Sequence, residues 1–407
     1  MRKSSVSLLS IAMVVSLAIS QAAIPAEANH AGMQMNSGPD VKIPDPTKVV
    51  MIVNRDSNDI AFMDIPSKKI VATTFLGDNV NPHMVMMSPD GRYVVTGGTR
   101  ANTAYIIETA TAKLVKKIPV DIAPEHLAFS PDSRWYYQGN PDGDSISVID
   151  MQSLTKIKTI PGLAEPLNVT FTPDGSKAYV GNYGAHWVGV IDVKRHELLK
   201  RIQIAPPENR AGLDPERYLG EIKGINVAMP TPDSRYLFAA DSDLGVVGVI
   251  DTRDDKVVKV IRVGKDPWRV YMGHDGKYAI TPNNGDETIS IIDVVNQKVA
   301  ATLEAGPDMT GINFAAGKAF VISSTSGFVY VYDMKSLKPA GRIKIGTNVQ
   351  LETATTDTAE EKIYLADSTE NAVVIIDAKT QTFEKVRNVG LYPWGTHVMD
   401  SKDNYCH

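Results

Sequence analysis

One cassette recurs along almost the whole chain, and this repetition constrains the fold more than any other feature of the sequence. Each copy has a strand that begins near an aromatic residue, a strand that ends in Ile-Asp or a close variant, a Lys-rich strand, and an apolar strand that ends in a Ser-Pro-Asp-Gly-like turn. The turn occurs at residues 88–91, 130–133, 172–175, 231–234 and, in a degraded form, 273–276. The aromatic-led strands begin near Tyr93, Tyr136, Tyr179, Tyr236, Tyr278, Phe320 and Tyr364, and an earlier copy begins at about Val50, which makes eight copies.

The spacing of these copies is typical of a β-propeller. Successive copies start 42 to 44 residues apart, with one step of 57, and periods of about 40 residues with four short strands are the signature of propeller blades. Such sheets bury a continuous core only when each packs face to face on the next. The sequence therefore predicts an all-β fold, a single propeller of eight blades with four antiparallel strands each. A seven-bladed ring with one divergent cassette outside it, and one or two β-sandwiches, are the alternatives.

The order of the strands predicts how the ring closes. The apolar strand after each Gly/Pro linker is expected to be the innermost strand of a blade. The chain then opens with the three outer strands of the first blade, from Val50, and ends with one more inner strand around residues 395–399. We expect this last strand to complete the first blade, so that the N- and C-terminal segments pair. Closure of this kind removes the exposed edges that an open sheet would present.

The cassettes resemble the YVTN family of β-propeller repeats. The tetrapeptide is approximated by YVVT at 93–96, YVGN at 179–182 and YAIT at 278–281, and the SPDG and VID elements are closer matches. The resemblance covers residues 48–404. It implies a periplasmic propeller, and members of this group include solute- and DNA-binding propellers, metal chaperones, and propeller subunits of periplasmic oxidoreductases. These subunits include those of amine dehydrogenases, hydrazine synthase and nitrite reductase. No active-site motif of these relatives is matched, so no catalytic residue is assigned.

The N-terminus has the pattern of an export signal. Arg2 and Lys3 precede an apolar run over residues 8–19, and Ala26-Glu27-Ala28 offers a small-x-small cleavage site. The alternative is an uncleaved anchor, but the run is shorter than the roughly 20 apolar residues that a span needs. We therefore expect a periplasmic or secreted protein with no membrane span after cleavage. The predicted organisation is a signal peptide at 1–28, a flexible leader at 29–47, the propeller at 48–404 and a tail at 405–407.

Composition excludes several classes of protein. The only cysteine is Cys406, so no intramolecular disulfide can form, and the absence of Cys-x-x-Cys-His excludes covalently attached c-type haem. A formal net charge of −5, with Lys and Arg scattered along the chain, disfavours nucleic acid as a partner. The sequence has no P-loop, Rossmann glycine fingerprint, HExxH motif or nucleophile elbow.

Four histidines are predicted to lie on or near one mouth of the central channel. In the predicted topology, the starts of the inner strands line this mouth, and His83, His126 and His397 lie in three of these strands. His186 lies on a turn of the same face. Neutral imidazoles are common ligands of zinc, copper and iron, so these four histidines could hold a metal ion or a non-covalent haem. The alternative is that His83 and His126, which are offset by one position, point to opposite sides of their strands and one packs between blades.

Other polar and aromatic residues are predicted at the same mouth and could bind a small ligand. They are Glu125, Asn168, Asn226, Trp268, Arg269 and Trp394. Arg269 with Trp268 could hold an anion by charge and stacking, whereas a hydrated channel wall would need polar residues in any case. An insertion at 205–224 could be a lid, a docking arm or a tolerated loop. His30, Met33 and Met35 offer soft ligands for Cu(I) or form part of a disordered leader.

These features lead to two functional hypotheses. The first is a binding or assembly subunit without catalytic activity of its own, which uses the channel mouth to contact a ligand or a periplasmic partner such as a redox enzyme. The alternative is a cofactor-dependent periplasmic oxidoreductase, or a metal chaperone, that binds haem, copper or zinc through the channel histidines.

Overall fold

The computed structural model describes residues 42–205 and 222–403. The predicted signal peptide, most of the leader with His30, Met33 and Met35, most of the insertion, and the tail with Cys406 lie outside the described residues. Within the described ranges, no helix is long and apolar enough to span a membrane.

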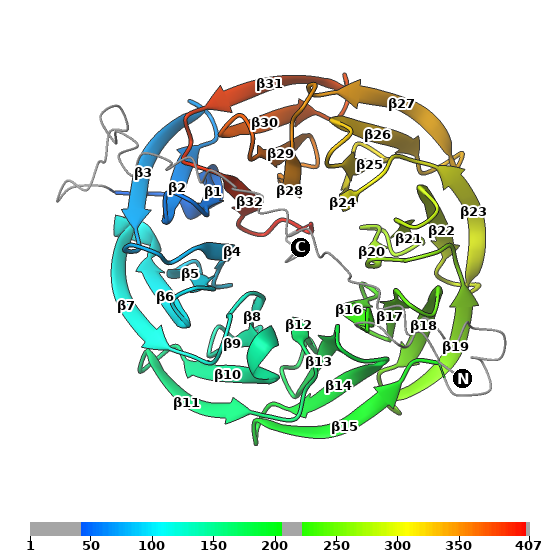
Figure 1. The fold of residues 1–407 in the computed structure, drawn as a ribbon, viewed down its shortest axis with the longest axis horizontal. Coiled ribbons are helices and arrows are strands. Elements are labelled where there is room, and N and C mark those ends of the chain that lie inside the picture. Colours follow the sequence, from blue (N-terminus) through cyan, green and yellow to red (C-terminus); the bar gives the residue numbers. More distant parts are fainter. Residues whose placement is uncertain (1–41, 206–221, 404–407) are drawn as a thin grey trace, which may run out of the picture. The chain divides into compact units, whose positions relative to one another are not determined.

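Eight four-stranded antiparallel sheets are arranged in a ring around a central channel (Figure 1). The protein is a single eight-bladed β-propeller, so the predicted fold is confirmed and the seven-bladed alternative is wrong. In every blade, the innermost strand is the apolar strand that follows a Gly/Pro linker, as the sequence predicted.

Each blade runs from an innermost strand at the channel to an outermost strand on the wall of the ring. In this order, blades 1 to 4 consist of β32 (Pro393–Val398), β1 (Val49–Asn54), β2 (Asp59–Asp64) and β3 (Lys69–Phe75); β4 (Pro82–Met87), β5 (Tyr93–Gly98), β6 (Thr103–Glu108) and β7 (Lys113–Pro119); β8 (Leu127–Phe129), β9 (Trp135–Asn140), β10 (Ser145–Asp150) and β11 (Thr155–Ile160); and β12 (Pro166–Phe171), β13 (Lys177–Asn182), β14 (Trp187–Asp192) and β15 (Glu197–Gln203). Blades 5 to 8 consist of β16 (Ile225–Pro230), β17 (Tyr236–Asp241), β18 (Val246–Asp251) and β19 (Lys256–Arg262); β20 (Tyr271–Met272), β21 (Tyr278–Asn283), β22 (Thr288–Asp293) and β23 (Lys298–Glu304); β24 (Met309–Ala315), β25 (Lys318–Ser323), β26 (Phe328–Asp333) and β27 (Lys338–Lys344); and β28 (Leu351–Thr356), β29 (Lys362–Asp367), β30 (Ala372–Asp377) and β31 (Thr382–Arg387). Short 3-10 turns, η1 (Pro46–Lys48), η2 (Thr109–Thr111) and η3 (Pro141–Gly143), lie at three connections.

The recurring turn is held by side-chain hydrogen bonds that its sequence supplies. In the turn between β4 and β5, the Ser88 hydroxyl donates to Asp90 at 2.6 Å and accepts from the amide of Tyr93 at 3.0 Å. Gly91 adopts a positive φ of 72°, which glycine tolerates without steric cost. The same Ser/Thr-to-Asp hydrogen bond recurs in three later turns, which explains why the cassette is so well preserved along the chain.

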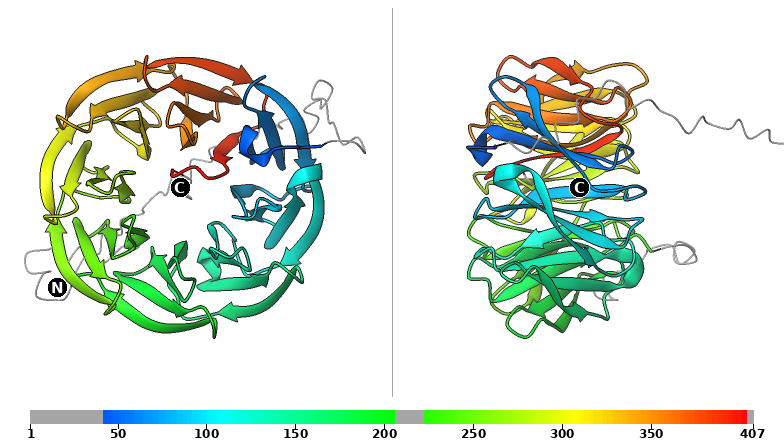
Figure 2. Two further views of the ribbon diagram at one scale, coloured as in Figure 1. Left: turned by 180° about the vertical axis from the view of Figure 1, so that it is seen from behind. Right: turned by 90° about the vertical axis from the view of Figure 1, so that its left-hand side faces the viewer.

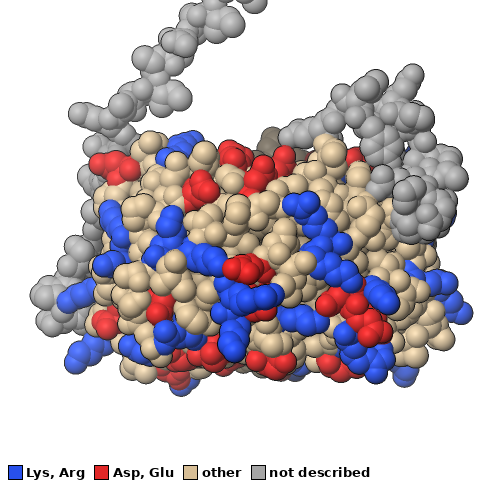
Figure 3. Space-filling model, turned by 90° about the horizontal axis from the view of Figure 1, so that it is seen from below, with Lys and Arg blue, Asp and Glu red and all other residues tan. Residues whose placement is uncertain are grey.

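Burial follows the position of a strand within its blade. The middle strands are packed on both faces by the neighbouring blades, so a strand such as β18 is buried at every residue. The outermost strands alternate between exposed and partly buried residues, as in β23, and carry the lysines of the cassette on the outer wall. Lysines on an unpaired edge oppose edge-to-edge aggregation. On the wall seen in Figure 3, basic and acidic residues are interspersed, with no extended patch of one sign.

The last strand closes the ring by pairing with the first. β32 lies antiparallel to β1, with Val398 opposite Val50 and Thr396 opposite Ile52, so blade 1 combines both ends of the propeller (Figure 2). After β32 the chain turns into the ring, where Asp403 is fully buried. We call residues 399–403 the C-terminal strap.

Candidate binding site at the channel mouth

A β-bulge near the start of the inner strands determines which side chains line the mouth. In blade 2, Pro82 pairs with Gly98 and Val85 with Thr96, so two residues, His83 and Met84, oppose one residue of β5. Blades 4, 5 and 8 show the same shift, and bulges of this kind re-aim side chains. Every blade has one residue at the same register position as His83. From blade 1 to blade 8, these residues are Trp394, His83, Glu125, Leu167, Asn226, Trp268, Thr310 and Glu352.

Blades 2 and 3 bring two histidines and a carboxylate together at this level. The side chains of His83, Glu125 and His126 each offer one ligand atom, and these atoms all lie within 4.8 Å of one another. The His83 and His126 ring centroids are 5.9 Å apart, and Nε2 of His126 is 4.0 Å from Oε2 of Glu125. The one-residue offset therefore does not separate the two rings, because they come from neighbouring blades.

The environment of this group sets its protonation. Burial, followed by the charges of Arg55 and Arg269, lowers the pKa of His83 to about 3, so this imidazole is neutral at neutral pH. Nδ1 of His83 is buried and has no hydrogen-bond partner among the described residues. Burial raises the pKa of Glu125 to about 7, and Arg55 partly opposes this effect. His83 thus offers a neutral nitrogen donor, and Glu125 becomes a carboxylate donor as pH rises through about 7.

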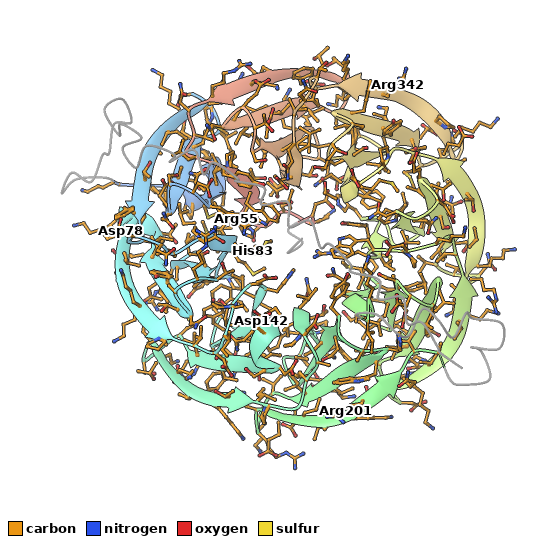
Figure 4. The ribbon with its side chains drawn as sticks, viewed as in Figure 1. Arg55, Asp78, His83, Asp142, Arg201 and Arg342 are labelled. Atoms are coloured by element: carbon orange, nitrogen blue, oxygen red, sulfur yellow. The ribbon has the colours of Figure 1, made fainter. Side chains whose placement is uncertain are left out.

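Arg55 completes the mouth and was missed by the sequence analysis. It lies in the turn between β1 and β2, and its guanidinium carbon is 4.4 Å from the centre of the Trp394 ring. The Trp394 ring lies 5.2 Å from that of His83 and stacks on Tyr392 at 6.3 Å. Figure 4 shows Arg55 and His83 near each other on the channel side of the blades. Its position in the sequence could have identified Arg55, because it lies in a turn on the same face of the ring as the predicted site.

Two further charged residues lie at the starts of inner strands elsewhere around the mouth: Glu352 at the position equivalent to His83, and Arg269 one residue after it. Glu352 in blade 8 is buried and accepts a hydrogen bond from the Ser368 hydroxyl at 2.8 Å, and burial raises its pKa. The sequence analysis did not identify Glu352. Arg269 in blade 6 is buried and lies 5.7 Å from the centre of the Trp268 ring, so the predicted Trp268–Arg269 pair is present.

The remaining predicted residues are not part of the group of His83, Glu125 and His126. His397 is buried near the opposite end of β32, where its Nε2 accepts a hydrogen bond from the Met87 amide at 3.3 Å. Nδ1 of His186 lies 2.9 Å from a carboxylate oxygen of the buried Asp241, between blades 4 and 5. Asn226 is fully buried. Asn168 lines a separate cavity of about 470 Å³, which also reaches Met229 and Lys402 of the strap.

The fold and this mouth define the protein as an eight-bladed propeller with a polar, partly aromatic site at one end of its channel. No protein-family model matches the sequence, and no curated protein matches it either.

Solved structures share the fold. The chain is similar to the dihydro-heme d1 dehydrogenase NirN in complex with DHE, with a TM-score of 0.72 and 19% identity over 87% of this chain and 76% of that one. It is also similar to Kuenenia stuttgartiensis hydrazine synthase, with a TM-score of 0.55 and 20% identity over 77% of this chain and 97% of that one. A functionally unknown protein from Desulfotomaculum acetoxidans DSM 771 matches with a TM-score of 0.55 and 12% identity over 86% of this chain and 98% of that one.

Proposed function

We propose that this protein is an exported binding subunit that holds a transition-metal ion, zinc or copper, at the channel mouth through His83, Glu125 and His126. The observation that carries this proposal is the convergence of three ligand atoms within 4.8 Å. Two imidazole nitrogens and a carboxylate oxygen are a ligand set that zinc accepts, and imidazole also suits copper. Three protein ligands leave a coordination position open for a further ligand or a partner's side chain.

Export and a protein partner are parts of the same proposal. The N-terminal pattern supports export, and the resemblance to YVTN propellers supports a periplasmic location. Two of the similar structures are redox proteins, a dehydrogenase and hydrazine synthase, which supports a role beside a periplasmic redox enzyme.

Metal titration of the chelator-treated protein tests the proposal. We expect one zinc or copper ion per chain, measured by calorimetry and elemental analysis. His83→Ala and His126→Ala should each weaken binding by at least about tenfold, because changes around bound metals have effects of this size or larger. His397→Gln is the matched control and should leave the affinity unchanged, since His397 lies outside the group. Unchanged affinity in both His83→Ala and His126→Ala would contradict the proposal.

A second candidate function is a redox protein that binds a haem-like cofactor in the channel. It is favoured by the buried Nδ1 of His83, which has no hydrogen-bond partner in the described ranges and is a suitable donor to iron. The similarity to NirN in complex with DHE points in the same direction. In this case His83 would hold the cofactor, which would supply the electron-transfer chemistry. The protein purified from its native host would then be coloured, with a Soret band that His83→Ala removes, whereas a colourless preparation containing stoichiometric zinc supports the first candidate.

A further inference from the structure

Arg55 carries a positive charge that no described carboxylate contacts in an ion pair. Its Nη2 donates to Oδ1 of Asn81 at 2.9 Å, and this neutral oxygen also accepts from the Thr99 hydroxyl at 2.9 Å. The guanidinium also covers the Trp394 ring, with its central carbon 4.4 Å from the ring centre. Within residues 42–205 and 222–403, no Asp or Glu oxygen lies within ion-pair distance of Arg55, which is half-buried at the mouth.

Other half-buried arginines in the same fold show what is unusual about Arg55. Arg134 lies 4.9 Å from the centre of the Trp135 ring and forms an ion pair with Asp150 at 2.9 Å. Arg235 stacks in the same way on Tyr236 and forms an ion pair with Asp251. Each of these stacked arginines thus has an acidic partner from its own blade. Arg55 has the same aromatic support without an ion-pair contact among the described residues, although its charge lowers the pKa values of Glu125 and Glu352.

Trp394 presents a second donor at the same place. Its indole Nε1 is buried and has no hydrogen-bond acceptor among the described residues. An indole N–H and a guanidinium can only donate hydrogen bonds, so a metal ion cannot satisfy either of them. A group with negative oxygen atoms can accept from both donors, and arginine binds carboxylate and phosphate through its planar fork.

We infer that Arg55 and Trp394 form a subsite for a small oxyanion, a carboxylate or a phosphate group, at the channel mouth beside His83. The inference rests on the proposed use of this mouth for binding, and it specifies the charge and chemistry of what enters. The subsite lies next to the metal group, because the Trp394 and His83 rings are 5.2 Å apart. A ligand that spans both would carry an anionic oxygen for Arg55 and a donor atom for the metal.

Calorimetric titration of the metal-free, full-length mature protein with inorganic phosphate and, separately, with acetate tests this subsite. We expect saturable binding of at least one of the two anions, at one site per chain. Arg55→Gln should weaken it by at least about tenfold, because charge-assisted hydrogen bonds are roughly twice as strong as neutral ones. Arg55→Lys should give an intermediate affinity, since it keeps the charge and loses the fork. Trp394→Phe should weaken binding severalfold, because it keeps an aromatic ring and removes the N–H donor.

The chain supplies a matched control for Arg55. Arg201 stacks on Trp187 at 4.8 Å but lies on the outer strand β15, far from the channel in Figure 4, and donates to the Gly162 carbonyl. Arg201→Gln should leave anion binding unchanged. Thermal unfolding followed by circular dichroism establishes that each variant is folded before its affinity is compared.

The outcomes separate this inference from the proposed metal function. Binding of acetate alone identifies a carboxylate ligand, and binding of phosphate alone identifies a phosphate; either supports the subsite. Binding of neither anion, or equal binding by Arg55→Gln and the wild-type protein, overturns the inference even if zinc binds. His126→Ala should lose zinc and keep the anion. A protein that binds the anion through Arg55 but no metal would retain the subsite and contradict the metal proposal.

Discussion

Nε2 of His274 lies 2.6 Å from Oδ1 of Asp403, so the strap that follows β32 in blade 1 is fastened to blade 6. The other oxygen of Asp403 accepts hydrogen bonds from the Phe314 amide at 2.8 Å, in blade 7, and from the Thr356 hydroxyl, in blade 8. Nδ1 of His274 lies 3.0 Å from Oε1 of Glu360, also in blade 8. One buried carboxylate thus connects four blades.

The His274–Asp403 pair predicts a loss of stability at alkaline pH. Burial alone would lower the pKa of His274, but the hydrogen bond and charge of Asp403, together with Glu360, outweigh it and raise the pKa above 6.5. A raised histidine pKa contributes stability that is fully present below the unfolded value and is lost as pH rises through the folded value. The wild-type protein should therefore have a higher free energy of unfolding in urea than His274→Gln. This difference should be larger at about pH 6 than at about pH 9. A difference that does not change with pH would contradict the prediction.

Asp403 itself is expected to contribute strongly to the free energy of unfolding. Asp403→Asn removes the charge opposite His274 and places amide hydrogens against a donor, so the free energy of unfolding should fall by about 2 kcal/mol. Asp400→Asn is the control, because Asp400 is exposed, and it should change stability by less than about 0.5 kcal/mol. Equal effects of the two variants would mean that the strap does not stabilise the ring.

Gly181 is predicted to be required for the contact between blades 4 and 5. A Cβ at this position would lie 2.3 Å from the carbonyl oxygen of Asn226, a backbone atom of β16 that cannot move alone. Gly181→Ala should therefore destabilise the protein by about 2 kcal/mol through overpacking. The nearest atom to a Cβ at Gly184 is 3.4 Å away, so Gly184→Ala should change stability by less than about 1 kcal/mol in chemical denaturation.

Ring closure by β32 can be tested by removing it. Deletion of residues 393–407 leaves blade 1 with three strands and exposes the inner edge of β1, and unpaired edges promote association between chains. We expect oligomers or aggregates in size-exclusion chromatography with light scattering. Deletion of residues 404–407 alone should give the wild-type profile. A peptide of residues 391–403 added during refolding should restore the monomer, and its failure to bind would argue against a closing role for this strand.

The fold could be predicted from the sequence because its information is local and repeated. The turn between β4 and β5, with its Ser88–Asp90 hydrogen bond, marks the end of one strand and the start of the next. Each later copy of this turn supports the same assignment of strands. The predicted closing strand began at residue 395, whereas β32 begins at Pro393. This difference helps to explain why His397 was expected at the mouth and is found near the other end of the strand.

The site could be predicted only in part, because its members come from different blades. His83 lies at the start of β4, and Glu125 and His126 lie just before β8. The repeat identifies these positions, and the sequence analysis placed all three residues at the mouth. Arg55 lies 339 residues before Trp394 in the sequence, and only ring closure brings them into contact. A bulge in the inner strands also shifts the alternation of side chains, which the ideal two-residue period of a strand does not reveal.

The pairing of β32 with β1 has a consequence for the order in which the protein is made. β1 is the first described strand and its partner β32 is the last described one, so blade 1 remains incomplete until residues 393–398 have left the ribosome. The His83–Trp394 and Arg55–Trp394 contacts form only after this final strand arrives. A nascent chain that lacks β32 therefore cannot form the Arg55–Trp394 part of the channel mouth, which appears only when the ring has closed.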